Sequence, residues 1–197
     1  MKRFAIAAML AIAALSGCIA PVGPVQVTRF HAPDVSPLGK GAIAVEPAPG
    51  SDSASLEWQT YSAAVIRQLQ LLGYTEARPG SGGQVALVSV SRRTIEPQGR
   101  SPVSVGVGGS TGTYGSGVGL GLGLGINLSP KPAAQVATDL SVSIRDRTSG
   151  VTLWEGRATF TVSSKSPMAG TALGAPKMSA ALFAGFPGQS GATIEVK

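Results

Sequence analysis

Two runs of alternating apolar and polar residues, separated by a short turn, lie in the C-terminal half of the chain. In the first run Leu140, Val142 and Ile144 alternate with polar neighbours. After a Gly-containing turn at residues 146–150 the alternation resumes and continues to Val162. Successive side chains of a β-strand point to opposite faces, so one face of both runs is apolar and needs a second layer to cover it. The pattern predicts an antiparallel β-hairpin whose apolar face belongs to the core.

A long amphipathic helix precedes these runs and can supply the second layer. Its apolar residues recur at steps of three and four: Trp58, Tyr61, Val65, Leu69 and Leu72. Asp52 and Ser53 offer an N-cap, Glu57 places negative charge near the positive end of the helix dipole, and Gly73 stands where a left-handed C-cap residue belongs. At this helical spacing the aromatic residues are predicted to be core residues rather than the lining of a ligand site.

Shorter patterns complete the predicted architecture. Residues 41–45, 74–77 and 84–95 have the apolar runs of strands, and a short helix is expected near 178–184. The order of elements is then strand, helix, short strand, strand, insertion, hairpin and small helix. We predict an α+β fold, in which one long amphipathic helix packs on one face of a mainly antiparallel sheet, with a Gly-rich hairpin or loop as an insertion.

The insertion is the segment 101–129, in which ten of the twenty-nine residues are Gly. From Gly117 to Gly125, Gly alternates with aliphatic residues, and this period of two excludes a GxGxxG nucleotide loop. Three interpretations remain open: a flexible low-complexity loop, a β-ribbon extending from the sheet, or a hairpin that associates with a membrane or with itself. If the segment is a ribbon, residues 103–107 form its opposing arm and 111–115 its turn.

The N-terminus has the order of a secretory signal. Lys2 and Arg3 are basic, the next twelve residues are apolar without a break, and small residues precede Cys18. A run of twelve is shorter than the ~20 residues that a membrane-spanning helix needs. The sequence Leu-Ser-Gly-Cys at 15–18 resembles the lipobox of bacterial lipoproteins. That resemblance implies cleavage between Gly17 and Cys18, a diacylglycerol on the Cys18 thiol, and an acyl chain such as palmitate on the new amino group.

These features divide the chain into a signal peptide at 1–17, a lipidated Cys18 with a Pro-rich tether at 18–40, and a single α+β domain at 41–197. The spacing of Val25, Val27 and Phe30 predicts that the tether ends in a short entering strand. Cys18 is the only cysteine, so the mature domain has no thiol for a disulfide or a soft metal site. Lipoproteins retained in the inner membrane usually carry Asp directly after the lipidated Cys. Ile19 stands there in this chain, so the resemblance implies the periplasmic face of the outer membrane.

The charge of the mature chain does not indicate a nucleic-acid partner. Without Lys2 and Arg3, fourteen basic residues face ten acidic ones, which gives a net charge of about +4. The basic residues are scattered, with only Arg92 and Arg93 adjacent, and aromatic residues are few. A basic stripe interleaved with aromatic rings, on which bases could stack, is therefore missing from the sequence.

The candidate catalytic residues lack the partners that their chemistry needs. A G-x-S-x-G pattern surrounds Ser110, but its surroundings are Gly-rich, and the only histidine, His31, precedes Ser110 instead of following it. One histidine and no mature thiol leave no nitrogen- or sulfur-rich zinc site. Asp139, Asp146 and Glu155 fall on the predicted hairpin, where solvent exposure is the simpler explanation. We expect no enzyme activity, no metal and no cofactor.

Three stretches carry a resemblance to a known family: VIRQLQLLGY at 65–74, LSVSIRD at 140–146 with LWEGRA at 153–158, and LFAGFPG at 182–188. They make most of the mature chain similar to the domain-of-unknown-function 4136 lipoproteins of Gram-negative bacteria. The resemblance implies a lipid-anchored α+β domain with a Gly-rich insertion. It implies no agreed activity and supplies no catalytic residues, and the insertion of this chain is more aliphatic than that of similar members.

Together the patterns predict a non-enzymatic outer-membrane lipoprotein that acts as a structural or protein-interaction module. Its sheet edge or its Gly-rich ribbon would contact another envelope protein, and acylated Cys18 would hold it in the membrane. The alternative is a binder or carrier of an apolar or lipid-like molecule. An apolar cavity under Trp58, Tyr61 and Trp154 would favour the alternative, whereas a filled core would favour the interaction module. A hydrolase comes third, with Ser110→Ala as its test.

Overall fold

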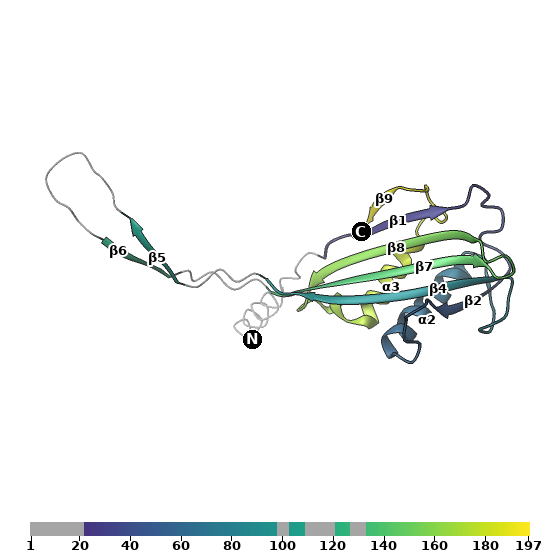
Figure 1. Ribbon diagram of the computed structural model, residues 1–197, viewed down its shortest axis with the longest axis horizontal. Helices are drawn as coiled ribbons and strands as arrows, with labels where there is room; N and C mark the ends of the chain where they lie inside the picture. The colour runs from purple at the N-terminus through teal and green to yellow at the C-terminus, as the bar shows by residue number, and fades with distance from the viewer. Residues whose placement is uncertain (1–21, 98–102, 109–120, 127–132) are drawn as a thin grey trace, which may run out of the picture.

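The computed structural model describes residues 22–97 and 133–197, together with the backbone of residues 103–108 and 121–126. Seven strands form one sheet in the order β3-β2-β4-β7-β8-β1-β9, and its central strands run the length of the domain (Figure 1). The strands are β1 (Val25–His31), β2 (Ala42–Pro47), β3 (Thr75–Glu76), β4 (Gln84–Ile95), β7 (Gln135–Asp146), β8 (Thr152–Ser163) and β9 (Thr193–Val196). The helical segments are α2 (Leu56–Leu71), the 3-10 helix η2 (Pro167–Ala169) and α3 (Thr171–Phe183).

The sheet is mixed, which corrects the predicted fold class of a mainly antiparallel sheet with one long helix. The strands from β4 through β7, β8 and β1 to β9 pair antiparallel, but β2 runs parallel to both β3 and β4. Ile43 of β2 lies opposite Gln84 of β4, and Pro47 lies opposite Val88. The physical reason is the helix between these strands, because a chain that crosses a sheet as a helix returns in its original direction.

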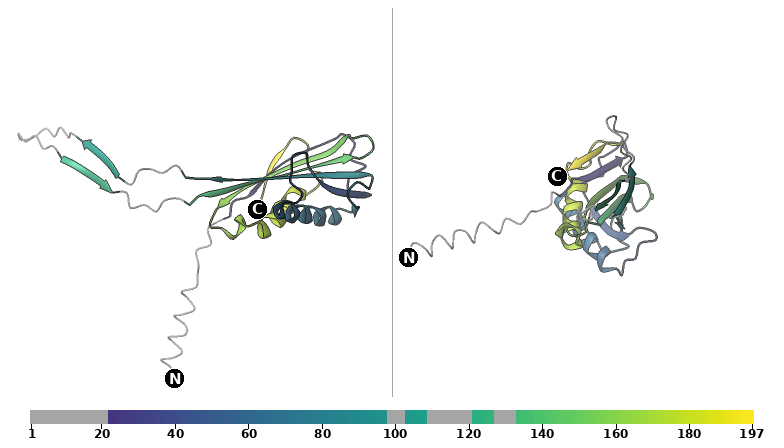
Figure 2. Two further views of the ribbon diagram at one scale, coloured as in Figure 1. Left: turned by 60° about the horizontal axis from the view of Figure 1, so that its bottom comes forward. Right: turned by 90° about the vertical axis from the view of Figure 1, so that its left-hand side faces the viewer.

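Two helices, not one, cover the apolar face of the sheet (Figure 2). α3 has thirteen residues, longer than the short helix predicted at 178–184, and Tyr61 Oη of α2 lies 3.7 Å from Met178 Sδ of α3. Pro176 and Gly174 lie within α3, and both residue types disfavour helix interiors. Seven residues of α3 are buried, so tertiary packing stabilises a helix of poor propensity. Within the described ranges no helix is long and apolar enough to span a bilayer.

α2 confirms the predicted amphipathic helix but begins later than its predicted cap. Ser55 is the N-cap residue, and its side chain makes no capping hydrogen bond. Asp52, the predicted cap, instead accepts the Ala54 N–H at 2.9 Å in the preceding turn. At the other end Gly73 has a φ of +102°, the left-handed conformation predicted for it. An added Cβ there would lie 2.6 Å from the Gly39 carbonyl oxygen, so the site requires glycine on two grounds.

The core lies between the sheet and the two helices and follows the alternation of the central strands. The fully buried side chains on this side of β7 and β8 include Leu140, Val142, Ile144 and Trp154. Gly156 faces the same way, and an added Cβ there would overlap the Trp154 ring and lie 2.8 Å from Leu182 Cδ1. Trp154 is thus a core residue, and Gly156 marks a close approach of the β8 backbone to the indole ring.

β1 lies within the segment that was predicted to be a tether with a short entering strand. It pairs with β8 on one side and β9 on the other, so the sheet begins at Val25 and not after residue 40. Val25 and Val27 are fully buried against the helix side of the sheet. The flanking prolines indicated a linker, and three apolar residues are too short a pattern to show that the strand docks beside β8. Six residues separate Cys18 from this strand.

The C-terminal tail, where the family resemblance places LFAGFPG, closes one side of the core with aromatic rings. Trp154 stacks on Phe183 with ring centroids 5.3 Å apart, and Phe186 tilts against both rings. Trp154 Nε1 donates to the Pro187 carbonyl at 3.0 Å. The buried guanidinium of Arg29 donates to two carbonyls in the last turn of α3, each at 2.9 Å, and burial lowers the pKa of Arg29. These contacts give the tail a structural role.

β5 (Val103–Gly108) and β6 (Gly121–Ile126) form a separate two-stranded antiparallel sheet. Their register begins with Val103 opposite Ile126. The backbone of these residues is a two-stranded hairpin, which agrees with both the second and the third interpretation of the Gly-rich insertion, and the valine-containing arm pairs as expected. The predicted turn at 111–115 lies outside the described residues. The chain enters the ribbon after β4 and leaves it before β7, at the same end of the sheet (Figure 1).

Candidate functional site

The face of the sheet opposite the helices is uncovered in the part of the chain that the structure describes (Figure 2). Because side chains alternate along a strand, the polar positions of the two alternating runs point to this face. The cross-strand register arranges them in rows over β4, β7, β8 and β1. The rows are Leu87, Ser143, Glu155 and Phe30; Ser89, Ser141, Arg157 and Thr28; and Ser91, Asp139, Thr159 and Gln26.

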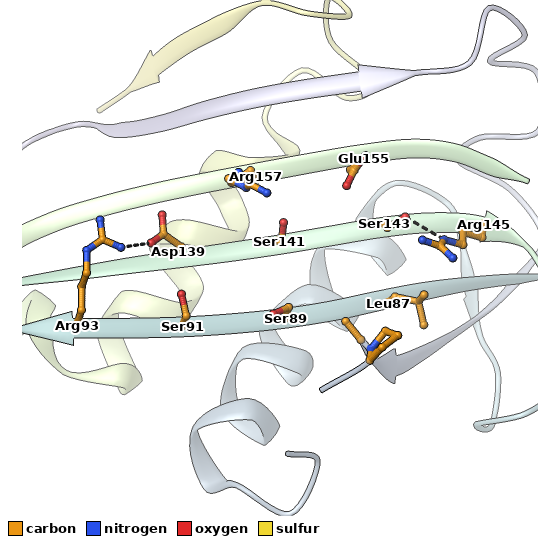
Figure 3. Close-up of a pocket in the computed structure, with 12 residues that line it drawn as sticks. Leu87, Ser89, Ser91, Arg93, Asp139, Ser141, Ser143, Arg145, Glu155 and Arg157 are labelled. Atoms are coloured by element: carbon orange, nitrogen blue, oxygen red, sulfur yellow. Dashed lines mark hydrogen bonds and ion pairs between the residues drawn. The ribbon is translucent and has the colours of Figure 1, made fainter. Parts of the chain in front are cut away.

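A shallow groove with a volume of about 530 Å³ lies along these rows (Figure 3). Its floor consists of short side chains: Ser89, Ser91, Ser141 and Ser143. Longer side chains surround the floor: Leu87, Arg93, Asp139, Arg145, Glu155 and Arg157. A second hollow of about 230 Å³ shares Ser141, Glu155 and Arg157 with the first and continues to Thr28 and Phe30 on β1. We call the two hollows together the open-face groove.

One charge pair of the open-face groove is already engaged. Arg93 Nη1 lies 2.8 Å from Asp139 Oδ2, and Thr159 Oγ1 donates to Asp139 Oδ1 at 2.7 Å. The Arg93 side chain is 61% exposed, so this pair contributes little to stability. Because both carboxylate oxygens of Asp139 have partners, this residue is poorly placed to act as a base.

Three other charged groups of the groove are available to a ligand. Among the described residues Arg157 and Glu155 form no ion pair and no side-chain hydrogen bond, whereas Arg145 Nε donates to Ser143 Oγ at 3.4 Å. Arg157 lies in the middle of the groove, with Ser141 and Thr28 as its direct cross-strand neighbours (Figure 3). Two cations and one carboxylate therefore give the available groups a net positive charge.

Phe30 adds an apolar surface to one wall of the groove. Its side chain is 54% exposed, and it lies on β1 opposite Glu155. The sequence pattern grouped Phe30 with Val25 and Val27, but strand alternation places Arg29, not Phe30, on the buried side. An exposed aromatic ring beside charged and hydroxyl groups can bind the apolar face of a ligand while its neighbours bind the polar edges.

His31 and a metal centre are the remaining sequence candidates that the described residues can test. His31 is at the end of β1, where Nδ1 lies 2.8 Å from the Ala32 carbonyl oxygen. No group of three or more His, Cys, Asp or Glu side chains in the described ranges is arranged to hold a metal ion. The open-face groove offers hydroxyl groups that donate or accept, guanidinium groups that donate, and the Glu155 carboxylate, which accepts.

The candidate residues from the sequence are distributed as follows. Gly17, Cys18 and Ser110 lie outside the described residues. Asp146 is the last residue of β7, and the backbone N–H of Ser149 in the following turn, at 2.7 Å, and the Ser149 hydroxyl lower the pKa of its carboxyl group.

Asp139 and Glu155, which the sequence assigned to solvent, both line the groove, and the sequence did not single out Arg157. Alternation showed that these positions were polar. It did not show that the same face would stay uncovered on four neighbouring strands.

Among the described residues, side chains pack the space between the sheet and the helices. Tyr61 and Trp154 are buried, and Trp58 Nε1 donates to the Val88 carbonyl at 3.0 Å. A gap between α2 and β2, lined by residues that include Ile43 and Tyr74, has no volume that a water molecule could occupy. A cavity under the aromatic residues would favour a carrier of an apolar molecule. The described residues do not form one at this gap.

No protein-family model and no curated protein matches the chain. Among solved structures, a variant of the PelC dodecamer from Paraburkholderia phytofirmans is similar at 15% identity with a TM-score of 0.42, over 80% of this chain and 96% of that one. Another PelC dodecamer from the same organism has 13% identity and a TM-score of 0.45, over 81% and 95%. A PDZ domain protein from Parabacteroides distasonis has 9% identity and a TM-score of 0.48, over 88% of this chain and 39% of that one. These likenesses are too distant to indicate a function, and the resemblance to the domain-of-unknown-function 4136 lipoproteins stays a prediction.

Proposed function

We propose that this chain is an outer-membrane lipoprotein, held on the periplasmic face by acylated Cys18, that acts as a non-enzymatic structural or protein-interaction module. The observation that carries the proposal is the open-face groove, a polar surface over four strands opposite a filled core. A domain that packs its helices on one face and leaves polar, partly unpaired side chains on the other has a surface for a partner. The partner in this proposal is another envelope component.

The short link between Cys18 and the sheet supports an anchored module. The seven residue steps from Cys18 to Val25 reach at most about 25 Å when fully extended. β7 has twelve residues, which at about 3.4 Å each give a sheet about 40 Å long. An acylated Cys18 would therefore hold the start of β1 near the membrane, and the β7–β8 turn at the opposite end of the sheet would extend into the periplasm.

Replacement of the lipidated residue tests the anchor. We expect the wild-type protein to incorporate labelled palmitate and to sediment with outer membranes. A Cys18→Ser variant should lose the label, because no other thiol can accept the diacylglycerol. Normal processing of this variant, with sedimentation that resists a carbonate wash, would show that something other than the lipid holds the protein.

Site-specific crosslinking in intact cells tests the interaction surface. A photoreactive amino acid at Ser141, on the floor of the open-face groove, should form an adduct with an envelope component. The same amino acid at Arg67, which is exposed on the outer side of α2, serves as the matched control and should form none. Equal adducts at both positions, or adducts at Arg67 alone, would contradict the assignment of the groove.

A carrier of an apolar molecule is not proposed, because the described interior favours the interaction module. Tyr61 and Trp154 contact neighbouring side chains rather than a cavity, and burial raises the pKa of Tyr61. A hydrolase is not proposed either. Ser110 lies outside the described residues, so the Ser110→Ala comparison remains its test.

A further inference from the structure

We propose that the open-face groove binds a saccharide polymer that carries carboxylates, with Arg157 as the carboxylate contact and Phe30 as the contact for a sugar ring. This inference rests on the proposed function, because the groove must face the periplasm to meet such a polymer. It goes beyond that function by naming the chemical class of the partner.

The composition of the groove favours a polar polymer over an apolar protein patch. The centres of protein–protein interfaces are depleted in serine, lysine and acidic residues and depend on buried aromatic and arginine anchors. The floor of this groove has the opposite composition: Ser89, Ser91, Ser141 and Ser143, with charged side chains around them. Hydroxyl groups that both donate and accept match a ligand whose surface consists of hydroxyl, amide and carboxylate groups.

The charges of the groove favour an acidic ligand. Asp139 is engaged with Arg93, so the available cations are Arg157 and Arg145 and the available carboxylate is Glu155. A guanidinium group can bind a carboxylate through two parallel N–H···O hydrogen bonds, a geometry that a lysine lacks. Glu155 would accept hydroxyl or amide donors of the same ligand.

The extent of the groove and its exposed ring indicate an extended chain rather than a single small molecule. The rows from β4 to β1 cross four adjacent strands, about 14 Å at a spacing of about 4.8 Å. Phe30, 54% exposed, stands at the β1 end of this path, and Arg157 stands one strand away in the next row. The C–H face of a sugar ring can cover the exposed aromatic ring while its carboxylate reaches the guanidinium.

Binding to purified cell-wall sacculi tests the proposal. The mature lipoprotein, extracted from membranes in detergent, is sedimented with sacculi at increasing concentration, and bound protein is measured in the pellet. We expect Arg157→Gln to weaken binding about tenfold, because hydrogen bonds to a charged group contribute most among polar contacts. Phe30→Ser should weaken it about threefold through loss of the ring contact. Arg67→Gln, which removes an exposed arginine from α2, should bind as the wild type does.

Further arms of the experiment separate the sources of the carboxylate. Competition by the soluble stem peptide tests the peptide carboxylates, and competition by soluble polyuronate tests carboxylates on the sugar itself. Competition in either arm supports the proposal and identifies the source. Unchanged binding in both arms overturns it, because the acidic group would then be irrelevant.

Two results would overturn the proposal of a saccharide ligand without contradicting the proposed function. Wild-type protein that stays in the supernatant with every polymer, yet crosslinks from Ser141 to an envelope protein, would show a protein partner in the groove. Sedimentation that Arg157→Gln and Arg67→Gln affect equally would place the polymer at another surface. Thermal unfolding of each variant shows whether the fold is intact, and we expect unchanged midpoints because Arg157, Phe30 and Arg67 are exposed.

Discussion

The close approach of Gly156 and Trp154 leads to a quantitative prediction for Gly156→Ala. The added methyl group would lie 2.8 Å from Leu182 Cδ1 and 2.9 Å from Trp154 Cζ2, whereas carbon atoms in contact prefer about 3.5–4.0 Å. The indole cannot easily move away, because it stacks on Phe183 and donates a hydrogen bond to Pro187. Overpacking of this kind costs about 1–3 kcal/mol.

A smaller effect opposes this cost. Alanine restricts the unfolded chain more than glycine does, which stabilises a compatible site by about 0.4–1 kcal/mol. We therefore expect Gly156→Ala to lower the free energy of unfolding by about 2 kcal/mol, which for a domain of this size lowers the melting temperature by about 4–8 °C. Urea unfolding followed by tryptophan fluorescence measures the free energy, and near-ultraviolet circular dichroism reports displacement of the indole.

Two comparisons separate steric overlap from a general effect of removing glycine. Gly83→Ala is the matched control, since an added Cβ there has nothing within 4 Å and its φ is not in the left-handed region. It should leave stability unchanged or raise it slightly. In a Trp154→Leu background the cost of Gly156→Ala should shrink by at least about 1 kcal/mol, because the overlapping ring is gone. The reasoning is refuted if Gly156→Ala and Gly83→Ala have the same stability, or if the cost persists in full without the indole.

Three further predictions concern hydrogen bonds that hold the fold. Arg29→Met should lower the free energy of unfolding by about 1–3 kcal/mol in urea, because it removes the side-chain donor to the Leu182 carbonyl and one of the two donors to the Ala181 carbonyl; an unchanged midpoint would contradict this. Trp58→Phe should cost about 1 kcal/mol by removing the hydrogen bond to the Val88 carbonyl, which thermal unfolding would detect. The pKa of Glu46 lies below its ordinary value of 4.5, mainly because it accepts the Gly80 N–H at 2.8 Å, and its ion pair with an arginine adds to this. The stabilisation by the Glu46 carboxylate is therefore present above pH 4.5 and lost as the pH falls through the folded pKa. Glu46→Gln should destabilise the protein at pH 7 and be as stable as the wild type once the pH lies below the folded pKa. A stability difference that grows in acid would contradict this prediction.

The strands and helix with strong local patterns were predictable with little error. β4 has the predicted bounds of residues 84 and 95, the two alternating runs became β7 and β8, and α2 ends before Gly73 as expected. These elements follow from the spacing of apolar residues, which is a property of the local chain. α3 was underestimated because Pro176 and Gly174 weaken its local signal, and its packing against α2 and the sheet compensates.

Long-range pairing was not predictable in the same way. β1 pairs with β8 across more than one hundred residues, and Arg29 reaches carbonyls of α3 that lie 152 and 153 residues away in the chain. β9, four residues long at the C-terminus, has no strong alternation of its own and forms because β1 offers it an edge. The parallel position of β2 depends on where α2 packs, which no single segment specifies.

The sequence by itself determined that the central strands have one apolar and one polar side and that an amphipathic helix is available to cover the apolar side. Only the tertiary structure decided that both helices pack on that side and leave the polar one open. It also decided the register that brings Arg157, Glu155 and Phe30 from two strands together above the serines of β7. The physical reason is that local periodicity already shows which side of a strand will be buried. The neighbours of each polar residue, in contrast, lie on other strands, which come together only when the whole sheet forms.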